Sequence, residues 1–140
     1  MNIELTTDWP LEKIAVYHPQ ITAAFAKLAE QYPHDVSVRG LAEATISGAQ
    51  QLWLVREGEE FKSFCLTETK TNDATGYKSV VITSLAGEGG QELAPLVAEV
   101  EKWATSIGAN EVQVVGRWGW KRGFEREGYR MDAILLRKAL

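Results

Sequence analysis

The chain has 140 residues, of which 45% are hydrophobic and 24% are charged, with a net charge of −4. This balance excludes a disordered chain and predicts one globular domain over residues 1–140. No apolar run approaches the ~20 residues that span a bilayer, and the N-terminus lacks the pattern of a signal peptide. Cys65 is the only cysteine, which excludes an intramolecular disulfide and a thiolate metal cluster. We therefore expect a cytoplasmic protein with no membrane partner.

The charge is unevenly distributed along the chain. Residues 117–140 carry seven basic and three acidic side chains, which leaves a net charge of −8 for the first 116 residues. Such asymmetry can mark a surface for phosphates or nucleic acid, or only a solvated face. Because the whole chain is acidic, its long-range attraction to DNA would be weak, and we expect no nucleic-acid partner.

The first half of the chain predicts a strand and two helices. Residues 1–5 alternate weakly and suit a short edge strand. Apolar residues then follow at helical spacing from Pro19 to Tyr32, and Pro33 ends that helix. A weaker helical pattern covers about residues 36–46 and is closed by Gly48.

The middle of the chain predicts an antiparallel meander. Strands are expected over 52–56, 61–69 and 77–85, with a turn at 57–59 and a polar connection over 70–76. On the second strand, strict alternation predicts one face made of four side chains. These are Phe61, Ser63, Cys65 and Thr67.

After residue 85 the apolar residues recur at every third or fourth position instead of at every second position. Residues 93–107 predict the clearest amphipathic helix, followed by a strand at 111–115, a short helix at 118–127 and a closing strand at 129–138. This order predicts an α/β (α+β) fold with a mixed, mainly antiparallel sheet and a right-handed parallel crossover around the long helix.

The strongest local signal is Leu85-Ala86-Gly87-Glu88-Gly89-Gly90, between a strand and a helix. Glycines let the backbone approach a ligand, and the N-terminus of the helix that follows favours anions. We therefore expect the loop to bind phosphate oxygens. A flexible turn is the alternative. The loop matches neither the P-loop pattern nor the Rossmann glycine pattern.

Ser84-Leu85-Ala86-Gly87-Glu88-Gly89 resembles the Gln/Arg-x-x-Gly-x-Gly/Ala signature of GNAT acetyltransferases, at the position where that family places it. The segment 123–129 resembles the closing segment of the family, and the order of elements matches over about 50–138. Residues 116–122 resemble small GNAT-like proteins of tailed phages and prophages. The resemblance implies a GNAT-like twisted sheet flanked by about four helices.

The same resemblance implies acetyl-CoA as cosubstrate and an amine as acceptor. The two histidines are widely spaced in the sequence, and we expect no metal. In the family, the amides of the glycine loop hold the pyrophosphate of coenzyme A. The residues that we expect to bind the cofactor are Ser84, Leu85, Gly87, Glu88, Gly89, Gly90, Gln91 and Arg117.

The chain departs from the family pattern at the catalytic positions. Ser84 stands where the family has Gln or Arg, and Gly116 and Arg117 stand where an asparagine is often found. Phe124 replaces the tyrosine that commonly protonates the leaving thiolate, and the strand 77–85 carries no carboxylate. Glu68 and Glu88 are the nearest candidate bases for an amine near neutral pH, and each also suits a solvated carboxylate.

Two functions therefore stay open. The first is an N-acetyltransferase that moves an acetyl group from acetyl-CoA to an amine. The second is a catalytically inactive GNAT-like module, for instance a phage structural or partner-binding protein associated with the virion. The cationic segment around Trp118 would then bind a protein partner or a second copy, while Trp120 and Phe124 pack in the core.

Overall fold

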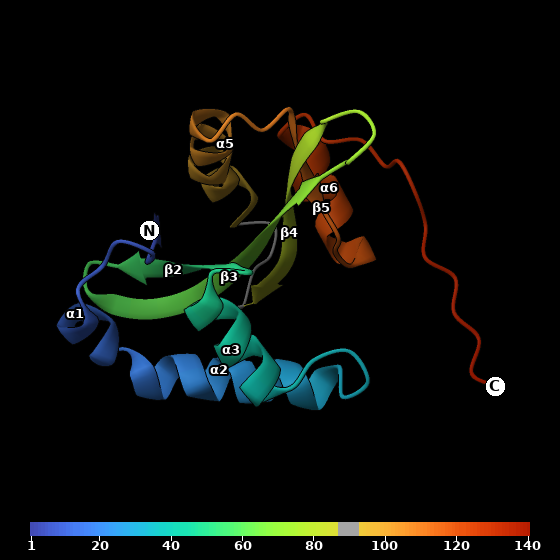
Figure 1. Cartoon of the computed structure of the whole chain (residues 1–140). Coiled ribbons are helices and arrows are strands. Elements are labelled where there is room, and N and C mark those ends of the chain that lie inside the picture. Colours follow the sequence, from blue (N-terminus) through green and yellow to red (C-terminus); the bar gives the residue numbers. More distant parts are fainter. Residues whose placement is uncertain (87–92) are drawn as a thin grey trace.

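The computed structural model describes residues 1–86 and 93–140, and a five-stranded sheet lies between two layers of helices (Figure 1). The order of the strands across the sheet follows the chain, and all neighbours are antiparallel except the parallel pair β4–β5. The predicted mixed, mainly antiparallel sheet is confirmed. The strands are β1 (Asn2–Leu5), β2 (Gln51–Glu57), β3 (Glu60–Thr71), β4 (Lys78–Ala86) and β5 (Glu111–Val114).

Three helices cover one face of the sheet: α1 (Leu11–Ala15), α2 (His18–Gln31) and α3 (Val38–Ser47). The apolar stripe of α2 is buried against β2 and β3, where Phe25 meets Phe64 edge-on at 5.6 Å between ring centroids. Both predicted helices are confirmed, and Gly48 ends α3 in the left-handed conformation that glycine adopts without strain. The short α1 was not predicted, because it buries no side chain and so carries no apolar stripe.

The opposite face is covered by η1 (Ala94–Leu96), α5 (Val97–Ser106), η2 (Trp118–Trp120) and α6 (Lys121–Arg126). The predicted apolar spacing of the long helix is confirmed, since four of its members are buried over β4 and β2. They are Leu93, Val97, Val100 and Ala104. As predicted, the connection from β4 through this helix returns to a parallel strand.

Strict alternation along β3 fails at one end. Val55 pairs with Ser63 and Arg56 pairs with Phe61, so Lys62 is an extra residue in a β-bulge. A bulge shifts the phase of the side chains, and Phe61 consequently packs on the α2 side with Phe64. The prediction that Phe61 shares a face with Cys65 was wrong for this reason.

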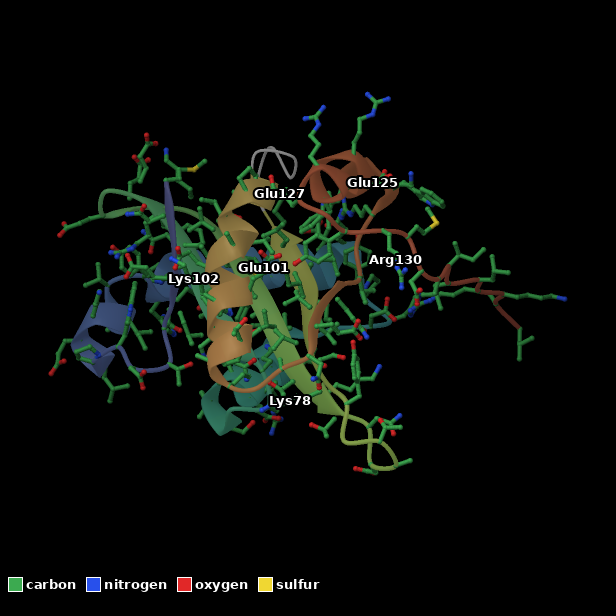
Figure 2. All side chains as sticks on the ribbon, turned by 90° about the horizontal axis from the view of Figure 1, so that it is seen from above. Lys78, Glu101, Lys102, Glu125, Glu127 and Arg130 are labelled. Carbon is green, nitrogen blue, oxygen red and sulfur yellow. The ribbon has the colours of Figure 1, made fainter. Side chains whose placement is uncertain are left out.

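The predicted closing strand at 129–138 is not formed. Tyr129 is still anchored: its amide donates to the Phe124 carbonyl at 3.0 Å and its hydroxyl donates to Glu101 Oε2 at 2.8 Å. Burial, together with this hydrogen bond, raises the pKa of Tyr129. Beyond Arg130 the chain extends away from the sheet (Figures 1 and 2). Within residues 1–86 and 93–140, no strand lies beside the β-forming sequence of this tail.

Candidate active site

The strands β4 and β5 run side by side for four residues and then part. Their pairing extends from Ser79–Glu111 to Ile82–Val114, and a last hydrogen bond joins the Val115 amide to the Ile82 carbonyl at 3.0 Å. Beyond it, β4 continues to Ala86 with β3 as its neighbour, while β5 has ended. Among the described residues, the edge of β4 that faces β5 therefore has no partner strand over 83–85.

A second β-bulge lies at the point where the strands part. Leu66 pairs with Ser84 and Thr67 pairs with Ile82, so Thr83 is an extra residue on β4. Bulges bend a strand and increase its twist, which turns the end of β4 away from β5. Ser84 lies opposite Leu66 and so shares the α2 face, whereas Leu85 is buried in the core on the α5 side. Among the described residues, no strand therefore lies beside this end of β4 on the β5 side.

Arg117 lies just past the end of β5, near the point where β4 and β5 part. Its Nε donates to the Tyr32 hydroxyl at 2.6 Å, and its guanidinium lies over the Tyr32 ring at 5.3 Å. Tyr32 caps the end of α2, so the contact ties the first helical layer to the open end of the sheet. The structure places Arg117 beside the parted strands, and its role in binding a cofactor stays a prediction.

Glu68 is exposed on β3 and lies opposite Val81. Its position in the alternation gives it the same face as Leu66 and Ser84, the face covered by α2 and α3. The five loop residues that we expect at the phosphates lie outside the described residues. They are Gly87, Glu88, Gly89, Gly90 and Gln91. β4 ends just before these residues, and the helical segment that starts at Leu93 follows them, which is the predicted order.

Phe124, the residue aligned with the usual proton donor, is a core side chain with 3% of its surface exposed. Its ring lies 5.3 Å from that of Tyr129 in an edge-on contact and 6.4 Å from that of Trp120. A phenyl ring at this position fills space, and it has no proton to give to a leaving thiolate.

We expect Phe124→Tyr to lower the free energy of unfolding by about 1–3 kcal/mol, because the added hydroxyl enters a packed apolar site. Urea denaturation of both proteins measures the effect. Phe61→Tyr is the matched control, since Phe61 is only partly buried and its ring edge can reach water. Unchanged stability with a gain in acetyl transfer would show instead that the new hydroxyl reaches the reacting group.

The two tryptophans of η2 differ in their exposure to solvent, as predicted. Trp118 is 72% exposed, while Trp120 is partly buried and packs against Phe124 and the core cluster. Lys121, the neighbouring cation, forms an ion pair with Glu125 at 2.8 Å. The exposed indole and the free end of β5 therefore lie on the same stretch of chain.

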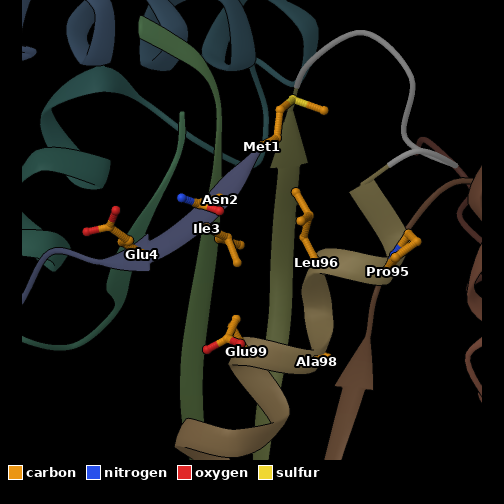
Figure 3. A pocket seen from close by; sticks show the side chains of 8 residues that line it. All are labelled: Met1, Asn2, Ile3, Glu4, Pro95, Leu96, Ala98 and Glu99. Carbon is orange, nitrogen blue, oxygen red and sulfur yellow. The ribbon is translucent and has the colours of Figure 1, made fainter. Parts of the chain in front are cut away.

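Burial raises the pKa of the Cys65 thiol to about 12, so it is not a nucleophile near neutral pH. A pocket of about 350 Å³ lies between β1 and the start of α5, and it is lined by both apolar and polar side chains, among them Glu4 and Glu99 (Figure 3). The described ranges contain no cluster of side chains suited to a metal ion. None of their helices is long and apolar enough to cross a membrane.

Neither a family model nor a curated protein sequence matches the chain. Solved structures do match it over nearly its whole length. A crystal structure described as a probable acetyltransferase has a TM-score of 0.73 at 16% identity, covering 100% of this chain and 97% of its own. A transcriptional regulator from Bacillus halodurans has 0.71 at 17% identity, with 99% of both chains covered.

Glucosamine-6-phosphate N-acetyltransferase from Arabidopsis thaliana has a TM-score of 0.65 at 12% identity, again with 99% of both chains covered. At such low identity the match concerns the arrangement of the backbone. The resemblance to phage proteins stays a prediction. The chain has the fold of the GNAT acetyltransferases.

Proposed function

We propose that the protein is an N-acetyltransferase that moves an acetyl group from acetyl-CoA to an amine. The observation that carries the proposal is the edge of β4 beyond Ile82, next to the end of β5, which no strand of the described residues pairs. Coenzyme A has an arm with two amide groups, which can hydrogen-bond to an open strand edge as a further strand would. Unpaired backbone groups held in place by the rest of a sheet suit such a ligand.

Ser84 and Leu85 would flank the arm, and the loop at 87–91 would supply amides to the pyrophosphate. Arg117 would add a positive charge where β4 and β5 part, and its guanidinium lies against Tyr32 there. These residues fit an anionic nucleotide with an amide-bearing arm. When bound, acetyl-CoA supplies the activated acetyl group, and the protein positions it against the acceptor.

The acceptor would approach from the face covered by α2 and α3, on which Ser84 and Glu68 lie. Attack on a thioester needs a neutral amine, so a carboxylate such as Glu68 or Glu88 would take the proton directly or through water. An amine acceptor agrees with the name of the Arabidopsis enzyme, an N-acetyltransferase. We place this activity in a single cytoplasmic domain.

A second candidate function is favoured by Phe124. A phenylalanine at this position lacks the hydroxyl that usually donates the proton, and the exposed Trp118 beside Arg117 and Lys121 offers an anchor for a protein partner. In this alternative the chain is an inactive GNAT-like module that binds a partner. The matched transcriptional regulator agrees with the idea that this fold serves more than one purpose.

Binding of acetyl-CoA distinguishes the two. We expect calorimetry to detect binding and the melting temperature to rise with ligand concentration, because the ligand binds the folded state. Gly89→Val should abolish both signals by keeping the phosphates from the backbone. Ala74→Val, in an exposed turn remote from the parted strands, is the matched control and should bind normally. No binding at millimolar acetyl-CoA would rule out the enzyme.

A further inference from the structure

The chain has four tyrosines, whose hydroxyl groups are candidate proton donors for the reaction proposed above. When an amine displaces the thiol of a thioester, the carbon–sulfur bond breaks with its electron pair on sulfur, and a proton given to that sulfur assists the step. Phe124 cannot give it, because a phenyl ring carries no acidic proton. The four candidates are Tyr17, Tyr32, Tyr77 and Tyr129.

Three of these tyrosines already donate their proton or lie away from the parted strands. Tyr17 donates to a backbone carbonyl at 2.7 Å, and Tyr129 donates to Glu101 Oε2 at 2.8 Å. Tyr77 stands directly before β4, at the end opposite to the one where β4 and β5 part. The fourth tyrosine differs from them in both respects.

Tyr32 lies at the end of α2 and contacts the chain just past the end of β5. Its hydroxyl accepts a hydrogen bond from Arg117 Nε at 2.6 Å, and the guanidinium lies 5.3 Å from the centre of its ring. Arg117 stands two residues after Val115, whose amide makes the last hydrogen bond to β4. Two residues span at most about 8 Å between Cα atoms. The Tyr32 hydroxyl is therefore held near the point where β4 and β5 part.

The Tyr32 hydroxyl keeps its own proton in this contact. Arginine only donates hydrogen bonds, so Arg117 occupies a lone pair of the phenol oxygen and leaves the O–H able to donate. The ring is partly buried against the apolar cluster of α2, β2 and β3, which fixes its position. If the proton leaves, the negative charge on the oxygen faces a guanidinium at hydrogen-bond distance. These properties suit a general acid.

We propose that Tyr32 is the general acid of the acetyl transfer and that its hydroxyl protonates the CoA sulfur as the carbon–sulfur bond breaks. The amine nitrogen bonds to the acetyl carbon and loses its surplus proton to a carboxylate or to water, while Tyr32 gives its proton to the sulfur. The phenolate recovers a proton from water, and the products are an amide and the CoA thiol. This role rests on the proposed function, since it needs acetyl-CoA at the parted strands.

Ionisation of the thiol in bound CoA tests the contact without turnover. A hydrogen bond from Tyr32 to the thiolate favours the ionised form, so the pKa of the bound thiol should be about one unit lower in the native protein than in Tyr32→Phe. The ultraviolet absorption of the thiolate, measured against a complex with desulfo-CoA, reports the difference. Tyr77→Phe is the matched control, because it removes the same atom from a tyrosine that is 46% exposed at the far end of β4.

Turnover distinguishes an acid from a support for Arg117. With ethylamine as the amine probe, release of the CoA thiol at saturating acetyl-CoA should fall about 100-fold in Tyr32→Phe, with the KM for acetyl-CoA unchanged. Arg117→Gln keeps the hydroxyl, so it should raise this KM more than it lowers kcat. If Arg117→Gln reproduces both effects of Tyr32→Phe, the tyrosine acts only by holding the arginine and the proposal fails.

Binding of acetyl-CoA separates a failure of this role from a failure of the proposed function. Native protein that binds no acetyl-CoA would remove the proposed function, and the acid with it. Native protein that binds acetyl-CoA, but whose bound CoA ionises at the same pH as in Tyr32→Phe, would keep the proposed function and overturn the role of Tyr32. Circular dichroism of each variant confirms that it is folded.

Discussion

Trp120→Ala is expected to lower the free energy of unfolding by about 3 kcal/mol, while Trp118→Ala changes it by less than about 0.5 kcal/mol. Trp120 is partly buried and packs with Phe124 against the core cluster, so its removal leaves part of that packing unfilled. Trp118, two residues away on the same turn, is 72% exposed and serves as the matched control. Urea denaturation of both variants measures the difference, and a more damaging Trp118→Ala would reverse our assignment of the two faces.

The same indole restricts which residues can stand at position 116. A Cβ atom added at Gly116 would fall on the ring carbons of Trp120, so no larger residue fits there while Trp120 keeps its position. This includes the asparagine that GNAT enzymes often have near the end of the fifth strand.

Gly116→Ala should therefore destabilise the native protein by about 1–3 kcal/mol through overpacking, and should cost much less in a Trp120→Ala background. This non-additivity is the signature of a direct contact. Equal costs in both backgrounds would mean that the backbone at Gly116, and not the indole, restricts the position.

Much of the fold could be predicted from the sequence because its signals are periodic. The spacing from Leu93 to Ile107 identified the helix between β4 and β5, and that helix requires the two strands to be parallel. The difference in exposure between Trp118 and Trp120 could be predicted because Trp120 and Phe124, four residues apart, lie on the same side of a helix.

The features that were predicted wrongly depend on contacts that the spacing of apolar residues in the sequence does not reveal. Phe61 changes face because the extra residue Lys62 shifts the alternation, and a bulge of this kind leaves no mark in a polar and apolar pattern. The tail at 129–138 has the composition of a strand, but a strand also needs a neighbouring edge. In the candidate site, the glycine pattern located the connection after β4. The bulge at Thr83, which parts β4 from β5, was not visible in the sequence.

Phe64→Ala is expected to have the largest effect on stability, about 3–5 kcal/mol. The ring is 99% buried between the sheet and α2, where Phe25 meets it edge-on, and neighbouring strands hold its backbone on both sides. Leu54 of β2 lies opposite it on one side and Ala86 of β4 on the other. A cavity at this point cannot collapse without moving three strands, so most of the lost packing should appear in the unfolding free energy.

Phe61→Ala is the matched control for this change, because it removes the same ring from the same strand and the same face. Phe61 is only partly buried at the margin of the cluster, so its truncation should cost about 1 kcal/mol. Since Phe64 is the partner of Ala86, its loss should also loosen the end of β4, and acetyl-CoA should bind more weakly to Phe64→Ala than to Phe61→Ala. Denaturation with urea and calorimetry on both variants test the two statements separately. Equal losses of stability would contradict the packing described for β3, whereas equal affinities would show that the end of β4 does not position the ligand.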